Sequence, residues 1–260
     1  MMLRSFFRKR KTLFLHVGTH KTGTTSIQAF LETHAGELAQ QGIYVPKAGR
    51  PEGCSGHHKF MWQMLEDPRI APNDDAVGAL ITELQTVDMS TVIISAEGLQ
   101  FLSARPEIMK VFCSKLRALG YRIELMLFLR ERESYITSLH KQHSNSGQGQ
   151  GLAWYHREAA RANAIRLSPI KYFDLDYRRL VRNLRRGTGG HIHVLDYDVC
   201  KERGGVLPDF LKCLGANEAL IEKSRAASWH NVSRRRSKLW PDQSGQVVTV
   251  PEPSTRRGEF

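Results

Sequence analysis

The stretch LFLHVGTHKTGTTSIQAFL, Leu13 to Leu31, decides the fold. An apolar run with the character of a strand ends at a loop that contains Gly18 and Gly23, and a helix-like pattern begins directly after the second glycine. A strand, a glycine-containing loop and a helix in this order let backbone amides at the helix N-terminus converge on an anion, with help from the helix dipole. The stretch therefore predicts a phosphate-binding loop.

The lysine of this loop stands in an unusual place. In a Walker A loop, G-x-x-x-x-G-K-[ST], the lysine follows the second glycine and reaches the β- and γ-phosphates. Here the frame of Gly18 and Gly23 is kept, but the lysine is Lys21, inside the loop, and Thr24 occupies the usual lysine position. This displacement counts against an ATPase or a kinase. Lys21 is better placed to contact one bridging or terminal oxygen of a ligand.

Strands and helices alternate along the rest of the chain. Apolar and β-branched runs predict strands at 12–17, 42–46, 91–95, 122–129 and 191–197, and helical spacing predicts helices at 24–40, 57–65, 74–87, 104–120, from 132, 172–186 and 206–215. Such alternation implies parallel strands with right-handed crossovers, so we expect an α/β fold: a P-loop-type parallel β-sheet flanked by helices on both faces. Ligands of such sheets bind at the carboxyl ends of the strands, where the loop, Glu97 and Arg130 all stand.

Length and composition bound the domain organisation. A chain of 260 residues with 41% hydrophobic and 25% charged residues is typical of a globular protein. We expect an α/β domain over 12–227, a basic segment over 1–11 and a poorly ordered basic tail over 228–260. No apolar run approaches the roughly 18 residues of a membrane span, and the N-terminus lacks the pattern of a secretory signal. The four scattered cysteines suit a reducing compartment, so we expect a cytoplasmic protein.

The formal net charge of +12 indicates an anionic ligand or partner. The basic residues gather in three clusters: Arg4, Arg8, Lys9, Arg10 and Lys11; Arg178, Arg179, Arg182, Arg185 and Arg186; and Arg234, Arg235 and Arg236. Nucleic acid, an anionic membrane surface, an acidic glycan, a polyanionic nucleotide or plainly solvated faces would all fit. Nucleic acid is not expected as a partner, because no helix-turn-helix, RNA-binding aromatic signature or zinc site is present. Peripheral membrane contact and the oligomeric state stay open.

A second motif lies downstream, in LFLRERESYITSLHKQ (127–142). Arg130 ends a predicted strand, and Ser138 follows eight residues later in the next predicted helix. A guanidinium offers a bidentate grip on phosphate, and a hydroxyl so placed can return to the same anion. Together with HKTGTTSIQ in the loop, this motif resembles the sulfotransferases that use 3′-phosphoadenosine 5′-phosphosulfate (PAPS). Their loop, Lys/Arg-Ser/Thr-Gly-Thr-Thr/Ser, holds the 5′-phosphosulfate, and their later arginine and serine hold the 3′-phosphate.

The resemblance covers residues 12 to about 146 well and 174–198 loosely, and it is nearer to bacterial members than to animal cytosolic enzymes. No glycine-rich adenosine-binding segment stands at the C-terminus, so the contacts of the adenine are not assigned. The resemblance implies transfer of a sulfuryl group from PAPS to a hydroxyl of a carbohydrate or similar acceptor, without a metal. The residues that would bind PAPS are His20, Lys21, Thr22, Gly23, Thr24, Thr25, Ser26, Arg130 and Ser138.

Four residues are candidates for the catalytic work. Lys21 would stabilise negative charge on the oxygen that bridges sulfur and phosphate. The acceptor hydroxyl needs a general base, and Glu97 leaves the sheet where cytosolic family members place theirs. The alternative is the pair His57 and His58, since imidazole titrates near neutrality. Two other functions stay open: a P-loop kinase or NTPase, and a non-catalytic protein that binds a nucleotide or a polyanion.

Overall fold

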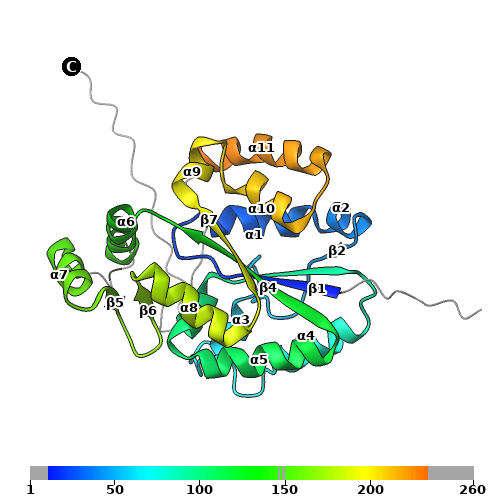
Figure 1. Ribbon diagram of the computed structural model, residues 1–260, viewed down its shortest axis with the longest axis horizontal. Coiled ribbons are helices and arrows are strands. Elements are labelled where there is room, and N and C mark those ends of the chain that lie inside the picture. Colours follow the sequence, from blue (N-terminus) through cyan, green and yellow to red (C-terminus); the bar gives the residue numbers. More distant parts are fainter. Residues whose placement is uncertain (1–10, 146, 148–149, 234–260) are drawn as a thin grey trace, which may run out of the picture.

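The computed structural model describes residues 11–145, 147 and 150–233 (Figure 1). Within this part of the chain, five parallel strands form one sheet in the order β2-β3-β1-β4-β7. Their bounds are β1 Lys11–His16, β2 Ile43–Tyr44, β3 Thr91–Ser95, β4 Tyr121–Leu129 and β7 His191–Asp196. A separate antiparallel pair consists of β5 Ala164–Arg166 and β6 Tyr172–Asp174.

Helices connect the strands. Those before β4 are α1 Thr24–Thr33, α2 Ala35–Gln40, α3 His58–Met64, α4 Ala76–Gln85, the 3₁₀ helix η1 Glu97–Ala104 and α5 Pro106–Ala118. Those after β4 are α6 Arg132–Asn145, α7 Leu152–Ala162, α8 Tyr177–Thr188, α9 Tyr197–Glu202, α10 Val206–Leu214 and α11 Glu218–Ser233. The expected fold class, a parallel sheet covered by helices on both faces, is confirmed.

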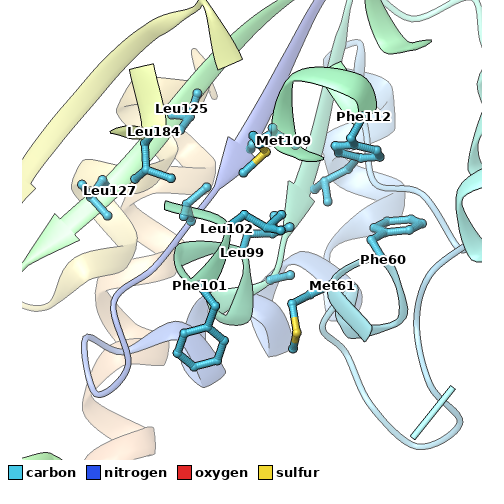
Figure 2. Close-up of a cluster of buried hydrophobic side chains, with 14 of the residues drawn as sticks. Phe60, Met61, Leu99, Phe101, Leu102, Met109, Phe112, Leu125, Leu127 and Leu184 are labelled. Carbon is cyan, nitrogen blue, oxygen red and sulfur yellow. The ribbon is translucent and has the colours of Figure 1, made fainter. Parts of the chain in front are cut away.

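Both faces of the sheet are buried at its central strands β3, β1 and β4, which is why these strands are almost continuously apolar, whereas the edge strand β7 is partly exposed. Leu13 and Leu15 of β1 point into a core under α3, α4, α5, η1 and α8, and Phe14 points into a second core under α1, α10 and α11. Figure 2 shows part of the first core, where Met61 of α3 lies near Leu99 of η1. The alternation of β1 between the two cores fixes its register, because a slip of one residue would exchange the two sets of side chains.

The central position of β1 determines where the site lies. His16, the last residue of β1, is in register with Ser95 of β3 and with Met126 of β4. The phosphate-loop candidate follows β1, Glu97 begins η1 just after β3, and Arg130 directly follows β4. The carboxyl ends of three adjacent strands therefore bring these segments to one edge of the sheet.

Some predicted elements differ from those observed. Residues 172–186 were expected to form one helix, but Tyr172–Asp174 is strand β6, and α8 begins at Tyr177. The Asp176 side chain caps α8 by accepting a hydrogen bond from the backbone N–H of Arg179, and a carboxylate at this position stabilises a helix start. The expected helix 24–40 is divided at His34 into α1 and α2.

The expected domain boundaries lie close to the limits of the described residues. Helix α11 continues to Ser233, beyond the boundary expected at residue 227. The rest of the expected tail, the basic cluster at 234–236 and nearly all of the basic segment 1–11 lie outside the described residues. Among the described residues, no helix has the length and apolar character needed to cross a bilayer.

Candidate functional site

The loop after β1 contains two residues with a left-handed backbone conformation. Lys21 and Gly23 have positive φ angles of 66° and 78°. Two threonine hydroxyls hold this shape, since Thr19 Oγ1 donates to the carbonyl of Phe128 at 2.8 Å and Thr22 Oγ1 donates to the carbonyl of Thr19 at 2.6 Å. Among the described residues, the amides of residues 21–25 donate no backbone hydrogen bond. These N–H groups at the start of α1 are therefore available to a ligand.

The loop leaves no room for side chains at its glycines. A Cβ atom on Gly23 would lie 2.8 Å from Val206 Cγ2, and one on Gly18 would lie 2.8 Å from Thr24 Oγ1. The Thr24 hydroxyl is itself buried and makes no hydrogen bond of ordinary geometry within the described part of the chain. Thr25 is exposed at the first turn of α1. The loop is thus tightly packed where its glycines meet Val206 and Thr24, and it presents polar groups at the start of α1.

Arg130 lies directly against this loop. Its Nη1 atom donates to the carbonyl of Lys21 at 3.4 Å, and its guanidinium carbon lies 5.1 Å from the centre of the Tyr197 ring. The carbonyl of Arg130 accepts a 2.6 Å hydrogen bond from the hydroxyl of Tyr177 at the start of α8. Arg130 Nε is buried without a partner among the described residues. Backbone and guanidinium are thus both held at the loop.

Arg130 and Ser138 face the same open depression, whose volume is about 350 Å³. Its lining residues come from the end of β4 and from α6: Arg130, Glu133, Ser134, Thr137, Ser138 and Lys141. Glu133 is the one carboxylate of this lining, and it pairs with Arg132 Nη1 at 3.0 Å. The spacing of Arg130 and Ser138 along the sequence therefore brings both to one cationic, hydroxyl-lined surface beside the loop.

Besides Glu133, sequence reasoning missed three members of this lining, each of which carries a hydroxyl or an ammonium group. Ser134 precedes Ser138 by four residues, Thr137 precedes it by one, and Lys141 follows it by three. Residues three and four apart share one face of a helix, so the helical spacing around Ser138 contained the signal. Lys141 is the most informative of the three, because it adds a second cation beside Arg130.

Glu97 lies on the other side of the loop, at the start of η1. Its side chain is 25% exposed, and its Oε1 atom lies 3.9 Å from His20 Nε2. Burial raises the pKa of the Glu97 carboxyl, whereas His58, the Thr24 hydroxyl and Lys21 act in the opposite direction. A carboxylate that is partly accessible and has a raised pKa is suited to accept a proton near neutrality.

His20 is the link between the loop and Glu97. Its ring stacks on Phe101 with a centroid distance of 5.1 Å, and the side-chain amide of Gln100 hydrogen-bonds to its Nδ1 atom. Burial, followed by the charges of Lys171, Lys21 and Arg69, lowers the pKa of His20 to about 3. His20 is therefore neutral at pH 7 and carries a single ring proton. Because Nδ1 accepts the hydrogen bond from the Gln100 amide, this proton is on Nε2, the nitrogen nearer to Glu97.

His57 occupies a structural position. Its Nε2 atom donates to the carbonyl of Pro46 at 2.9 Å, and its Nδ1 atom accepts from the backbone N–H of Ser95 at 3.2 Å. The side chain is 1% exposed, and burial lowers its pKa to about 4. Both ring nitrogens are engaged with the backbone, so His57 joins the start of α3 to the end of β3.

His58 is also buried, at 3% exposure, and burial lowers its pKa to about 4. The Glu97 charge partly opposes this shift, which places His58 near the carboxylate.

Of the residues predicted to hold a ligand, Ser26 is half-buried in α1, and its amide donates to the carbonyl of Gly23 at 3.0 Å. Within the described residues, no three His, Cys, Asp or Glu side chains gather as a metal site.

Comparisons with known proteins add only a distant likeness. No family model matches the chain, and no curated protein matches it. Among solved structures, the chain is similar to a sulfotransferase from Alicyclobacillus acidocaldarius, with a TM-score of 0.43 and 15% identity over 87% of this chain and 97% of that chain. It is also similar to a structure of the PezAT chromosomal toxin-antitoxin system of Streptococcus pneumoniae, with a TM-score of 0.37 and 16% identity over 86% and 87% of the two chains. Both likenesses are too distant to indicate an activity for this chain.

Proposed function

We propose that the protein is a sulfotransferase that moves a sulfuryl group from PAPS to a hydroxyl of a carbohydrate or similar acceptor. The observation that carries the proposal is the contact between the two predicted phosphate-binding elements. Arg130, which shares a depression with Ser138, hydrogen-bonds to the carbonyl of Lys21 in the loop. One small molecule could therefore reach both elements, as a ligand with a 5′-phosphosulfate and a 3′-phosphate requires.

The residues of the site fit such a donor. The amides of residues 21–25, which donate no backbone hydrogen bond to any described residue, and the helix dipole suit a 5′-phosphate. The guanidinium of Arg130, the hydroxyl of Ser138 and the ammonium of Lys141 suit a 3′-phosphate. A bound anion would also supply an acceptor for the buried Nε–H of Arg130, which lacks one among the described residues. Lys21, exposed at the crest of the loop, would stabilise negative charge on the leaving oxygen.

Glu97 is the proposed general base. When bound, the donor would supply the sulfuryl group, which passes to the acceptor oxygen as the bond between sulfur and the phosphate oxygen breaks. Glu97 would take the proton of the acceptor hydroxyl, and its raised pKa matches this task. Neutral His20 carries its proton on Nε2, which lies 3.9 Å from Glu97 Oε1, too far for a direct hydrogen bond. His57 is not assigned as the base, because both of its nitrogens bind backbone groups.

The experiment is a thermal-shift titration with 3′-phosphoadenosine 5′-phosphate (PAP), compared with ATP and Mg²⁺. We expect PAP to raise the melting temperature clearly, because only the bound native state gains free energy. Lys21→Ala and Arg130→Ala should weaken this shift, whereas Lys110→Ala, an exposed charge on α5, should leave it unchanged. A larger stabilisation by ATP with Mg²⁺ would instead support a kinase or NTPase and would end the sulfotransferase proposal.

A further inference from the structure

A groove beside α8 combines exposed arginines with apolar side chains. It has a volume of about 560 Å³ and lies between α8 and the end of β4, on the side of the sheet that α5 also covers (Figure 1). None of its residues lines the depression of Arg130 and Ser138, so it is a second surface feature of the described chain. Its lining residues are Leu129, Tyr177, Arg178, Val181, Arg182 and Arg185.

The three arginines stand along one face of α8. Arg178, Arg182 and Arg185 are four and three residues apart, so they share this face over about 10 Å. All three are exposed, and within the described residues their guanidinium groups form no ion pair or hydrogen bond. Arg179 differs, because its Nη2 atom binds Oδ1 of the buried Asp174 at 2.8 Å. The groove therefore carries three positive charges that no described carboxylate neutralises by direct contact.

The acidic residues at the ends of α8 and β7 bind backbone amides. Asp176 caps α8, and its pKa is lowered by its hydrogen bonds to the helix and by the charge of Arg182. Asp196 caps α9, where it accepts hydrogen bonds from two backbone N–H groups at 2.9 and 3.0 Å. Asp198 and Glu131 accept further backbone hydrogen bonds in the segment after β4 and at the start of α6. Asp176 therefore offsets part of one arginine charge, and the lining itself contains no carboxylate.

The other half of the lining is apolar. Leu129, Val181 and the ring of Tyr177 are half-buried, and the Tyr177 hydroxyl is already bound to a backbone carbonyl at 2.6 Å. The apolar surface continues onto the edge strand β7, where Val194 is 50% exposed. Val194 is in register with Leu127, two residues before Leu129, so it lies on the same face of the sheet as Leu129.

This combination of groups restricts the kind of partner. A neutral apolar partner would cover the three guanidinium groups without pairing them, at a cost in free energy. A nucleic acid or a sulfated glycan would bind the arginines but would leave Leu129, Val181 and Val194 without apolar contacts. A second copy of this chain is disfavoured, because each copy carries a formal net charge of +12. A protein segment with both carboxylates and aliphatic side chains fits best.

We infer that the groove beside α8 is a docking surface for an acidic amphipathic helix of a partner protein. A helix that lies along α8 has the same period of 3.6 residues, so its carboxylates at spacings of three and four residues meet Arg178, Arg182 and Arg185. Its aliphatic side chains then pack on Leu129 and Val181. Arginines beside an apolar centre are typical of protein interfaces. The inference goes beyond the proposed function and does not depend on it.

The test measures the binding of three labelled helical peptides to the full-length protein by fluorescence anisotropy. The first peptide has leucines on one face and glutamates beside them, the second has glutamine in place of each glutamate, and the third has serine in place of each leucine. We expect the first peptide to bind about tenfold or more tightly than either of the others. Equal affinity of the first and third peptides would indicate a general polyanion surface and would overturn the inference, as would binding of none.

Two triple variants locate the binding. Arg178→Gln, Arg182→Gln and Arg185→Gln together should weaken the first peptide about tenfold or more, because three exposed charge pairs are lost. Lys110→Gln, Lys115→Gln and Arg186→Gln remove the same charge from exposed positions outside the lining, and they should have no effect. Equal losses in both triple variants would show an effect of net charge alone and would overturn the inference.

A single apolar change and a membrane test complete the experiment. Val194→Ser, at an exposed position, should weaken the leucine peptide but not the serine peptide; the same affinity of the leucine peptide for both proteins would contradict an apolar contact at β7. Sedimentation with phosphatidylserine vesicles of the unmodified protein, but not of the variant at Arg178, Arg182 and Arg185, would assign the groove to a membrane surface and would overturn the inference.

Discussion

Replacing Arg130 by alanine should weaken the discrimination between PAP and 5′-AMP, two ligands that differ only in the 3′-phosphate. Arg130 is half-buried, and its Nη1 atom is 3.4 Å from the carbonyl of Lys21, which leaves most of its N–H groups for a ligand. Each hydrogen bond to a charged group contributes about 1.5–3 kcal/mol. Two such bonds, reduced by partial exposure to solvent, give a loss of about 3 kcal/mol, or roughly 100-fold in Kd for PAP.

Isothermal titration calorimetry with both nucleotides measures this loss. The affinity for 5′-AMP should stay the same within a factor of about two or three, because the loop contacts remain. Arg130→Lys should fall between the two proteins, since an ammonium keeps the charge but loses the planar fork. Arg178→Ala is the matched control, because Arg178 is an exposed arginine of α8 outside the depression. Equal losses for PAP and 5′-AMP would refute the reasoning, since they would show that Arg130 supports only the loop.

Three further changes test other parts of the structure. Glu97→Gln should lower sulfuryl transfer about 100-fold or more without weakening PAP binding, and the rate of the unmodified protein should rise with pH through the raised pKa of Glu97; full activity of the variant would exclude Glu97 as the base. His57 has a pKa of about 4 in the fold against an ordinary value of 6.5, so the unfolded chain binds more protons between these values. His57 should therefore contribute about 1.4 kcal/mol per unit to the fall in the free energy of unfolding as the pH drops from 6.5 towards 4, and the other buried histidines with lowered pKa values, His16, His20, His58 and His143, should add to that fall. Urea titrations should show a flatter fall in His57→Gln than in the unmodified protein; the same slope in both proteins would contradict this account. Gly23→Ala should lower the free energy of unfolding by about 1–3 kcal/mol, because Gly23 has a φ of 78° and alanine would press on Val206; a urea midpoint equal to that of the parent would refute the clash.

Patterns within single segments predicted the fold class, because each strand of the sheet is a local apolar run between turn residues. The same local reasoning found the loop, Glu97 and Arg130, since the carboxyl ends of parallel strands share one edge. It failed for β6, where YFD reads as the start of the arginine-rich helix until the antiparallel pairing with Ala164–Arg166 is known. Pairing between distant segments has no local signature, so tertiary contacts decide such cases.

The roles of the histidines were beyond sequence reasoning for the same reason. In the sequence, His57 and His58 are equivalent candidates for the base. In the structure, His57 binds the backbone at Pro46 and Ser95, which belong to other segments of the chain. What remained hidden was therefore the set of contacts that each side chain makes across elements.

Because β1 lies between β3 and β4, the segments that follow β3 and β4 lie on opposite sides of the loop that follows β1. Adjacent strands are about 4.8 Å apart, so the segments after β3 and β4 are separated by roughly 10 Å, with the loop between them. Under the proposed function, the nucleotide ribose and the acceptor would occupy opposite flanks. An environment-sensitive fluorophore on α6 would then respond to one substrate and a second fluorophore on η1 to the other, so the order of their arrival could be followed in real time within one molecule.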